Sequence, residues 1–221
     1  MSGIRMDPRG STRGFRETVG RAMAASPLAF VRARNLVTYA SVAAALGATA
    51  LAGGPSGRAR AGALLALAAL ADLLDGRFAR LFAADEDQRR FGVQIDSLAD
   101  AVTFGMTPVV CLLQLGGLDG MWRALLVLAS LVYVLVVLTR LGFYNIADDA
   151  GGFVGVPTTI AGIAWSALFF VAPGPWVPVA LLILGAAMIA PIPFARPRAP
   201  VIITLVLACI GLAIAHGRAA F

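Results

Sequence analysis

The feature that most constrains this chain is a series of apolar segments, each close to the length that crosses a lipid bilayer. Crossing the hydrocarbon core takes about 20 apolar residues in a helix. A helix satisfies all its backbone hydrogen bonds internally, as lipid requires. We place such segments at residues 36–53, 61–82, 92–116, 122–145, 157–172, 176–192 and 200–216. The sequence therefore predicts an all-α, polytopic membrane helix bundle, with a six-helix core and one extra span.

The fifth and sixth segments are short and need a separate argument. Residues 172–176 between them are Ala-Pro-Gly-Pro-Trp, and such Pro-Gly clusters mark turns. We therefore expect two helices here, although one merged or re-entrant segment would fit the same pattern.

The N-terminal 34 residues precede the first apolar segment. Within them, residues 15–34 mix Arg with Phe, Val, Met and Leu. An amphipathic helix lying on the membrane surface fits this pattern, and so does an irregular linker. We divide the chain into an N-terminal part, 1–34, with an expected surface helix, and a transmembrane domain, 35–221.

The arginines predict how the bundle is oriented. All 18 basic residues are Arg, and they cluster beside apolar segments, which argues against nucleic-acid binding. With the N-terminus in the cytoplasm, only Arg58, Arg60, Arg123 and Arg218 face the other side, and the other 14 face the cytoplasm. Because basic residues favour the cytoplasmic side of a membrane, we expect a cytoplasmic N-terminus.

Four aspartates interrupt the second and third apolar segments: Asp72, Asp75, Asp96 and Asp100. An ionised group at membrane depth costs at least a few kcal/mol until it finds a partner. The spacings i, i+3 and i, i+4 place each pair on one helix face. At about 1.5 Å per residue, the first pair lies roughly 15 and 10 Å before the end of its segment, and the second lies roughly 6 and 12 Å into the next. All four carboxylates can therefore meet at one depth, on the cytoplasmic side.

Such a cluster of carboxylates needs positive charge. A hard divalent cation such as Mg²⁺ or Mn²⁺ prefers oxygen ligands, and two such ions about 4 Å apart would suit phosphoryl transfer. Two other interpretations stay open on these grounds alone. One is a salt-bridge network that locks two helices, and the other is an ion or proton transporter that uses the buried carboxylates.

The run from residue 72 to residue 100 resembles the signature of the CDP-alcohol phosphatidyltransferase family, D-x-x-D-G-x-x-A-R followed by G-x-x-x-D-x-x-x-D. The eight matching residues are Asp72, Asp75, Gly76, Ala79, Arg80, Gly92, Asp96 and Asp100. The spacer between Arg80 and Gly92 is longer than is usual in the family. Its extra residues fall in a polar loop, so the helices on either side keep their register.

The resemblance implies an enzyme that transfers a phosphatidyl group from CDP-diacylglycerol to an alcohol and releases CMP. It implies Mg²⁺ or Mn²⁺ held by Asp72, Asp75, Asp96 and Asp100, with Asp100 also acting as general base. It implies that Gly76, Ala79, Arg80 and Gly92 line the CDP site. We expect an integral protein of the cell (inner) membrane, a cytoplasmic active site and a homodimer.

Within the family, residues 92–108 resemble the stretch GxxxDSLADxVxFGxxP of bacterial-type phosphatidylserine synthases. Residues 139–145 (TRLGFYN) and 153–159 (FVGVPTT) resemble their RLARFN and FxGLPTT stretches. The resemblance therefore implies L-serine as acceptor, with Arg140 and Asn145 as candidate acceptor-binding residues. Arg140 also fits an ordinary positive-inside anchor. Because Phe143 replaces the second Arg of RLARFN, glycerol 3-phosphate, inositol phosphate and choline stay open as alternative acceptors.

Overall fold

The computed structural model describes residues 26–146, 153–194 and 197–220. The chain divides into two compact units, residues 1–33 and 34–221. Of the first unit, the described part holds a 3-10 turn, η1 (Pro27–Phe30), in which the Ser26 hydroxyl accepts a hydrogen bond from the Leu28 N–H. Most of the surface helix expected at 15–34 lies outside the described residues, so that helix and the division at residue 34 stay predictions.

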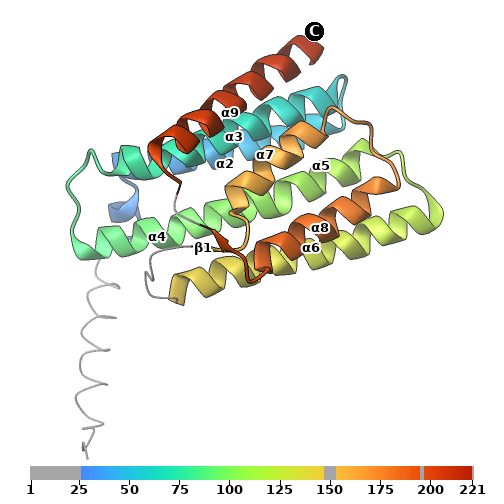
Figure 1. Ribbon diagram of the computed structural model, residues 1–221. Coiled ribbons are helices and arrows are strands. Elements are labelled where there is room, and N and C mark those ends of the chain that lie inside the picture. Colours follow the sequence, from blue (N-terminus) through green and yellow to red (C-terminus); the bar gives the residue numbers. More distant parts are fainter. Residues whose placement is uncertain (1–25, 147–152, 195–196, 221) are drawn as a thin grey trace, which may run out of the picture. The chain divides into compact units, whose positions relative to one another are not determined.

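The second unit is a bundle of apolar helices (Figure 1). After the short turn η2 (Ala33–Asn35), its helices are α2 (Leu36–Ala52), α3 (Gly57–Ala79), α4 (Glu86–Asp100), the π-helical turn η3 (Ala101–Met106), α5 (Thr107–Leu115), α6 (Gly120–Ile146), α7 (Thr158–Leu168), α8 (Trp176–Ile189) and α9 (Ala199–Ala220). Two short strands, β1 (Phe153–Val154) and β2 (Pro193–Phe194), pair antiparallel. The predicted helix bundle is confirmed.

Several of these helices can cross a membrane. By length and composition, four described stretches qualify: Ala33–Ala52, Glu86–Leu115, Gly120–Ile146 and Ala199–Ala220. The second of these joins α4, η3 and α5 into one continuous rod. Helix α3 has 23 residues, which at 1.5 Å per residue is about 35 Å, but it carries the charged residues predicted for the second segment.

Helices α7 and α8 are shorter than the segments predicted at 157–172 and 176–192. They have 11 and 14 residues, or about 17 and 21 Å, against a hydrocarbon core of about 30 Å. Helix α7 ends in a tight turn, where the Val171 N–H bonds to the Leu168 carbonyl. Helix α8 ends where Ala190 becomes extended before Pro191, because the residue before proline disfavours helical backbone.

A buried network fixes α7 against the rest of the bundle. The indole N–H of Trp165 donates to the Tyr133 hydroxyl at 3.1 Å, which in turn donates to the Phe104 carbonyl at 2.9 Å. All three side chains are fully buried, and the Tyr133 and Trp165 rings meet edge to face. Because buried polar networks hold one geometry when every member is satisfied, helices α6 and α7 are tied to η3.

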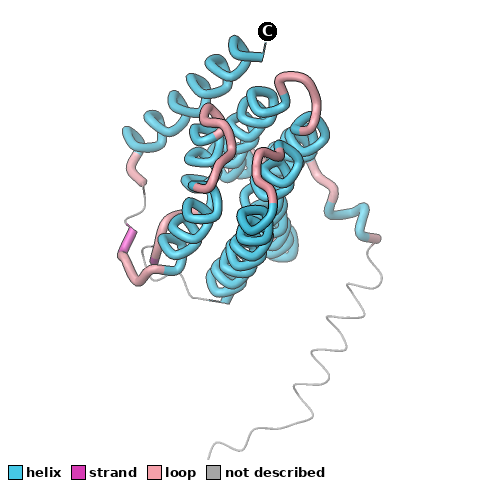
Figure 2. The backbone as a smooth tube through the Cα atoms, turned by 90° about the vertical axis from the view of Figure 1, so that its right-hand side faces the viewer, coloured by secondary structure: helices cyan, strands magenta, loops and turns pink. Residues whose placement is uncertain are grey.

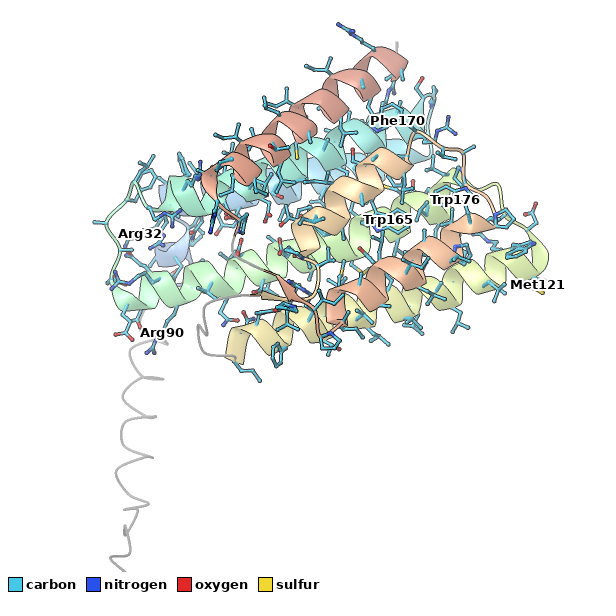
Figure 3. All side chains as sticks on the ribbon, in the orientation of Figure 1. Arg32, Arg90, Met121, Trp165, Phe170 and Trp176 are labelled. Carbon is cyan, nitrogen blue, oxygen red and sulfur yellow. The ribbon has the colours of Figure 1, made fainter. Side chains whose placement is uncertain are left out.

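Helix α9 runs along the outside of the bundle (Figure 2). Its one buried basic residue among those described, His216, donates from Nε2 to the Ser166 carbonyl at 2.8 Å and stacks on the Phe170 ring at 3.7 Å. The Ser166 hydroxyl then donates to the Gly62 carbonyl at 2.9 Å. This chain of contacts docks the extra span on α3 and α7. Figure 3 places Phe170, which takes part in these contacts, toward the end of the bundle that carries Met121. Arg90 lies at the opposite end.

Candidate active site

The aspartates from α3 and α4 come together as the sequence predicts. Asp72, Asp96 and Asp100 each offer a carboxylate oxygen within 4.8 Å of the others. Asp75 is not part of this close group of three, but its charge acts on both Asp96 and Asp100. All four side chains are half-buried. Four carboxylates at such distances repel one another unless a cation lies between them.

Three threonine hydroxyls bind this cluster from other helices. Thr38 in α2 donates to Asp75 at 3.0 Å, Thr158 in α7 donates to Asp100 at 2.7 Å, and Thr159 donates to Asp72 at 2.6 Å. Each hydroxyl donates to one oxygen, Oδ2, of its carboxylate. The roles of these threonines were not predicted from the sequence, although Thr158 and Thr159 lie in the FVGVPTT stretch.

The aspartates fit a divalent metal ion. At a metal–oxygen distance of about 2.1 Å, ligand oxygens on opposite sides of one Mg²⁺ are about 4.2 Å apart, close to the spread of these carboxylates. Their partners are hydroxyls, the kind of outer contact that orients a ligating carboxylate. The described residues therefore include an oxygen-rich group that can bind a metal ion, as the sequence predicts.

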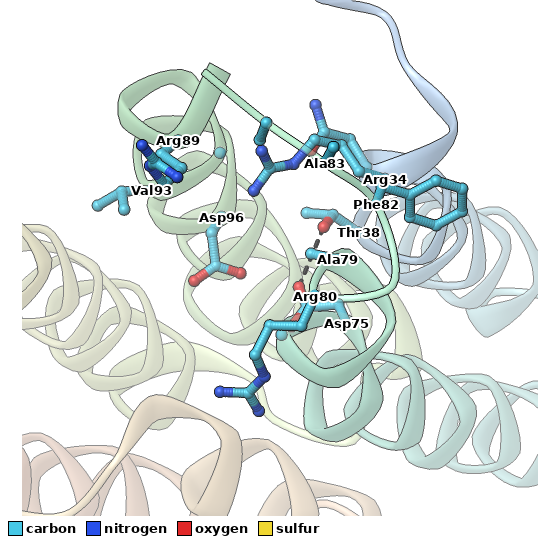
Figure 4. A pocket seen from close by; sticks show the side chains of 14 residues that line it. Arg34, Thr38, Asp75, Ala79, Arg80, Phe82, Ala83, Arg89, Val93 and Asp96 are labelled. Atoms are coloured by element: carbon cyan, nitrogen blue, oxygen red, sulfur yellow. Dashed lines mark hydrogen bonds between the residues drawn. The ribbon is translucent and has the colours of Figure 1, made fainter. Parts of the chain in front are cut away.

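A cavity of about 940 Å³ opens beside the aspartates. Two of the four aspartates, Asp75 and Asp96, line it together with the signature residues Gly76, Ala79, Arg80 and Gly92. Figure 4 shows Asp96 across from Asp75, with the Arg80 side chain extending from beside Asp75. A Cβ added at Gly76 would meet no atom within 4 Å, so this glycine leaves the cavity wall open.

Two further arginines line the same cavity, Arg34 and Arg89. Both are among the arginines expected on the cytoplasmic side, and neither was predicted to belong to a site. Arg34 is half-buried, and its Nε and Nη1 atoms are buried without a hydrogen-bond partner. Figure 4 shows Arg34, Arg80 and Arg89 around one opening. Three guanidinium groups and two carboxylates around one cavity suit a ligand that carries both phosphate groups and metal.

The two candidate acceptor-binding residues, Arg140 and Asn145, have different surroundings. Arg140 is 6% exposed, and its guanidinium lies 4.7 Å above the Tyr144 ring, within the range of a cation–π contact. Its Nε atom is buried without a hydrogen-bond partner. It lines a second cavity of about 250 Å³ together with Phe143. Asn145 is exposed and accepts a hydrogen bond from the Ser97 hydroxyl at 2.9 Å.

Comparison with known proteins agrees with this geometry. The family model for CDP-alcohol phosphatidyltransferases matches residues 31–194, well over half of the chain. The chain belongs to the CDP-alcohol phosphatidyltransferase family. The match covers the aspartates, the large cavity, Arg140 and the threonines of α7, and it ends before α9. Helix α9 is thus the extra span beyond the family core.

Among curated proteins, the chain is similar to CDP-diacylglycerol–serine O-phosphatidyltransferase of Mycobacterium tuberculosis, with 40% identity over 110 residues, 46% of this chain and 36% of that protein. It is similar to archaetidylserine synthase of Methanothermobacter thermautotrophicus, with 33% identity over 107 residues, 48% of this chain and 44% of that protein. It is also similar to CDP-diacylglycerol–serine O-phosphatidyltransferase of Helicobacter pylori, with 31% identity over 103 residues, 45% of this chain and 41% of that protein. The matches thus span less than half the length of each of these relatives.

Proposed function

We propose that this membrane enzyme transfers a phosphatidyl group from CDP-diacylglycerol to L-serine, giving phosphatidylserine and CMP. The observation that carries the proposal is the large cavity, because one space is lined by two aspartates of the cluster, three arginines and the signature glycines. A nucleoside diphosphate needs this combination of cations, metal ligands and room beside the backbone.

In this proposal the donor's diphosphate lies between the aspartates and the arginines. Asp72, Asp75, Asp96 and Asp100 would hold Mg²⁺ or Mn²⁺, which when bound would offset charge on the diphosphate. Gly76, Ala79, Arg80 and Gly92 would line the CDP site. We add Arg34 and Arg89, whose guanidinium groups would bind phosphate oxygens.

The reaction itself requires a base beside the acceptor. Asp100 would accept the proton of the serine hydroxyl as the oxygen attacks the phosphorus next to the lipid. The new P–O bond joins serine to the phosphatidyl group, and the P–O bond to CMP breaks. The Thr158 hydroxyl donates to Asp100 at 2.7 Å and so holds the carboxylate of this proposed base in place.

Serine as acceptor is supported by the names of the relatives. The mycobacterial and archaeal proteins differ in the lipid that their names imply, but both names contain serine. Arg140 would bind the serine carboxylate, because its guanidinium is the one cation among the described residues that line the second cavity. Asn145 would assist from the end of α6. A single arginine suits a single carboxylate better than the dianionic phosphate of glycerol 3-phosphate or inositol phosphate.

The cellular setting belongs to the same proposal. The charge asymmetry of the arginines supports a cytoplasmic N-terminus and a cytoplasmic active site. The cell (inner) membrane is then the natural location, since CDP-linked lipids are made from cytoplasmic nucleotides. We also propose a homodimer, and chemical cross-linking in membranes would test it.

The test is CMP release by purified protein in detergent, with CDP-diacylglycerol, Mn²⁺ or Mg²⁺, and serine, glycerol 3-phosphate, inositol phosphate, choline or no acceptor. We expect release that depends on serine and is lost in Asp100→Asn. Release with a different acceptor only would reassign the substrate. If folded protein releases no CMP with any acceptor but carries ions or protons across proteoliposomes, the enzyme proposal is wrong and the transporter interpretation is right.

A further inference from the structure

Two adjacent threonines at the start of α7 contact two different aspartates of the cluster. Thr158 donates to Oδ2 of Asp100 and Thr159 donates to Oδ2 of Asp72. Successive side chains on a helix point about 100° apart, so neighbours in sequence do not face the same partner. The pair therefore reaches two helices at once, α4 through Asp100 and α3 through Asp72.

These hydroxyls are not used for capping their own helix. The N-cap residue of α7 is Pro157, which makes no side-chain cap bond. Threonine near a helix start ordinarily bonds to the free N–H groups of the first turn. Here both hydroxyls point instead to carboxylates, and Thr158 is only 3% exposed. The first turn of α7, with its positive dipole end, thus faces two of the four aspartates.

The backbone that leads into the pair is fixed from two sides. The Gly155 N–H donates to the Ile192 carbonyl at 2.8 Å, and the Val156 N–H donates to the Ala187 carbonyl at 3.0 Å. Gly155 has φ +74°, and a Cβ there would collide with the Met188 carbonyl, so only glycine fits. On the other side, the Tyr144 hydroxyl donates to the Val154 carbonyl at 2.7 Å.

We infer that Thr158 and Thr159 are positioning residues, which hold Asp100 and Asp72 so that one oxygen of each stays directed at the shared metal site. The inference rests on the proposed function to the extent that both aspartates are metal ligands. Outer contacts of this kind change metal affinity or activity by about 10–100-fold when they are removed. In this inference, the atom directed at the metal site is the oxygen of each carboxylate that does not accept the threonine hydroxyl.

The test compares variants that keep or remove the hydroxyl. In Thr158→Val and Thr159→Val, which keep the branched shape, we expect the Kd for Mn²⁺ to rise about 10-fold. The concentration of unbound Mn²⁺ is measured by electron paramagnetic resonance on the purified full-length protein. We expect Thr158→Val also to lower kcat for CMP release at saturating Mn²⁺. In Thr158→Ser and Thr159→Ser, which keep the hydroxyl, the Kd for Mn²⁺ and the kcat for CMP release should stay near the wild-type values.

A matched control is Thr204→Val in α9, where the lost hydroxyl bonds only to the Pro200 carbonyl. It should change neither Mn²⁺ binding nor turnover. If a valine variant does not fold, the alanine variant at the same position takes its place in the comparison, because alanine also lacks the hydroxyl. Wild-type Mn²⁺ affinity in the hydroxyl-free variants would overturn the inference, and so would serine variants as impaired as the valine variants.

The Mn²⁺ measurement separates this inference from the proposed reaction. If no acceptor supports CMP release but Thr159→Val still weakens Mn²⁺ binding and Thr159→Ser does not, the positioning role stands and the reaction is wrong. If serine-dependent CMP release occurs and Mn²⁺ affinity is unchanged in both valine variants, the reaction stands and the positioning role is wrong.

Discussion

Gly162 is the position where a single methyl group should disturb the site from a distance. It lies one helical turn after Thr158 and faces the Phe104 ring. A Cβ added at Gly162 would collide with Cδ1 of the Phe104 ring and would lie 2.5 Å from its Cε1, whereas non-bonded carbons stay about 3.5–4.0 Å apart. The ring or the helix must therefore move by about 1 Å.

The ring has little freedom to give way. Phe104 is fully buried, and its carbonyl accepts the hydrogen bond from Tyr133. Overpacking of this kind costs about 1–3 kcal/mol. If α7 moves instead, Thr158 and Thr159 move with it, and a displacement of about 1 Å at a catalytic group can lower the rate about 100-fold. We expect Gly162→Ala to lower both the melting temperature and kcat.

The assay measures CMP release at saturating Mn²⁺ and thermal unfolding by tryptophan fluorescence, which Trp165 in the same helix should report. Gly211→Ala in α9 is the control, because a Cβ there meets no atom within 4 Å. Phe104→Leu in the Gly162→Ala background removes the ring and should recover part of both losses, as coupled neighbours do. A Gly162→Ala protein with wild-type melting and turnover would refute the reasoning.

Four other outcomes follow from the same structure. Arg34→Met should raise the KM for CDP-diacylglycerol about 10-fold with little change in kcat, measured by donor titration at fixed detergent; an unchanged KM would remove Arg34 from the donor site. EDTA should abolish CMP release, and added Mn²⁺ or Mg²⁺ should restore it; activity that survives chelation would contradict the metal site. Asp96→Asn should weaken Mn²⁺ binding by at least about 10-fold, with wild-type affinity as the contrary result. Gly62→Ala, whose Cβ would lie 2.5 Å from Cε1 of His216, should lower the melting temperature of the protein by loosening α9; an unchanged melting temperature would contradict this role of the His216 contact.

The site was predictable from the sequence where it depends on spacing along one helix. The spacings of Asp72 with Asp75 and of Asp96 with Asp100 place each pair on one face, and a short loop between antiparallel helices brings the pairs together. Gly76, Ala79, Arg80 and Gly92 followed from the family signature, and all four line the large cavity. The placement of these residues was predictable because helix geometry is local and a membrane admits few alternatives to helices; their roles stay predictions.

The contacts from distant segments were not predictable in this way. Thr38, Thr158 and Thr159 lie 37, 58 and 87 residues from the aspartates that they bind. The sequence pattern does not distinguish Arg34 from the other arginines beside apolar segments. Its position on the cavity wall depends on how α2 packs against α3 and α4. The shortness of α7 and α8 was also missed, because apolar residues continue past both helix ends.

The sequence alone determined the membrane class, the approximate positions of seven helical segments and the aspartate pairs, since each depends on hydrophobicity and periodicity over adjacent residues. Tertiary structure alone decided which hydroxyls hold the carboxylates, which arginines face the cavity, and how His216 docks α9 on Gly62 and Ser166. Those contacts depend on the rotation of each helix about its axis and on its neighbours, and packing between distant segments sets both.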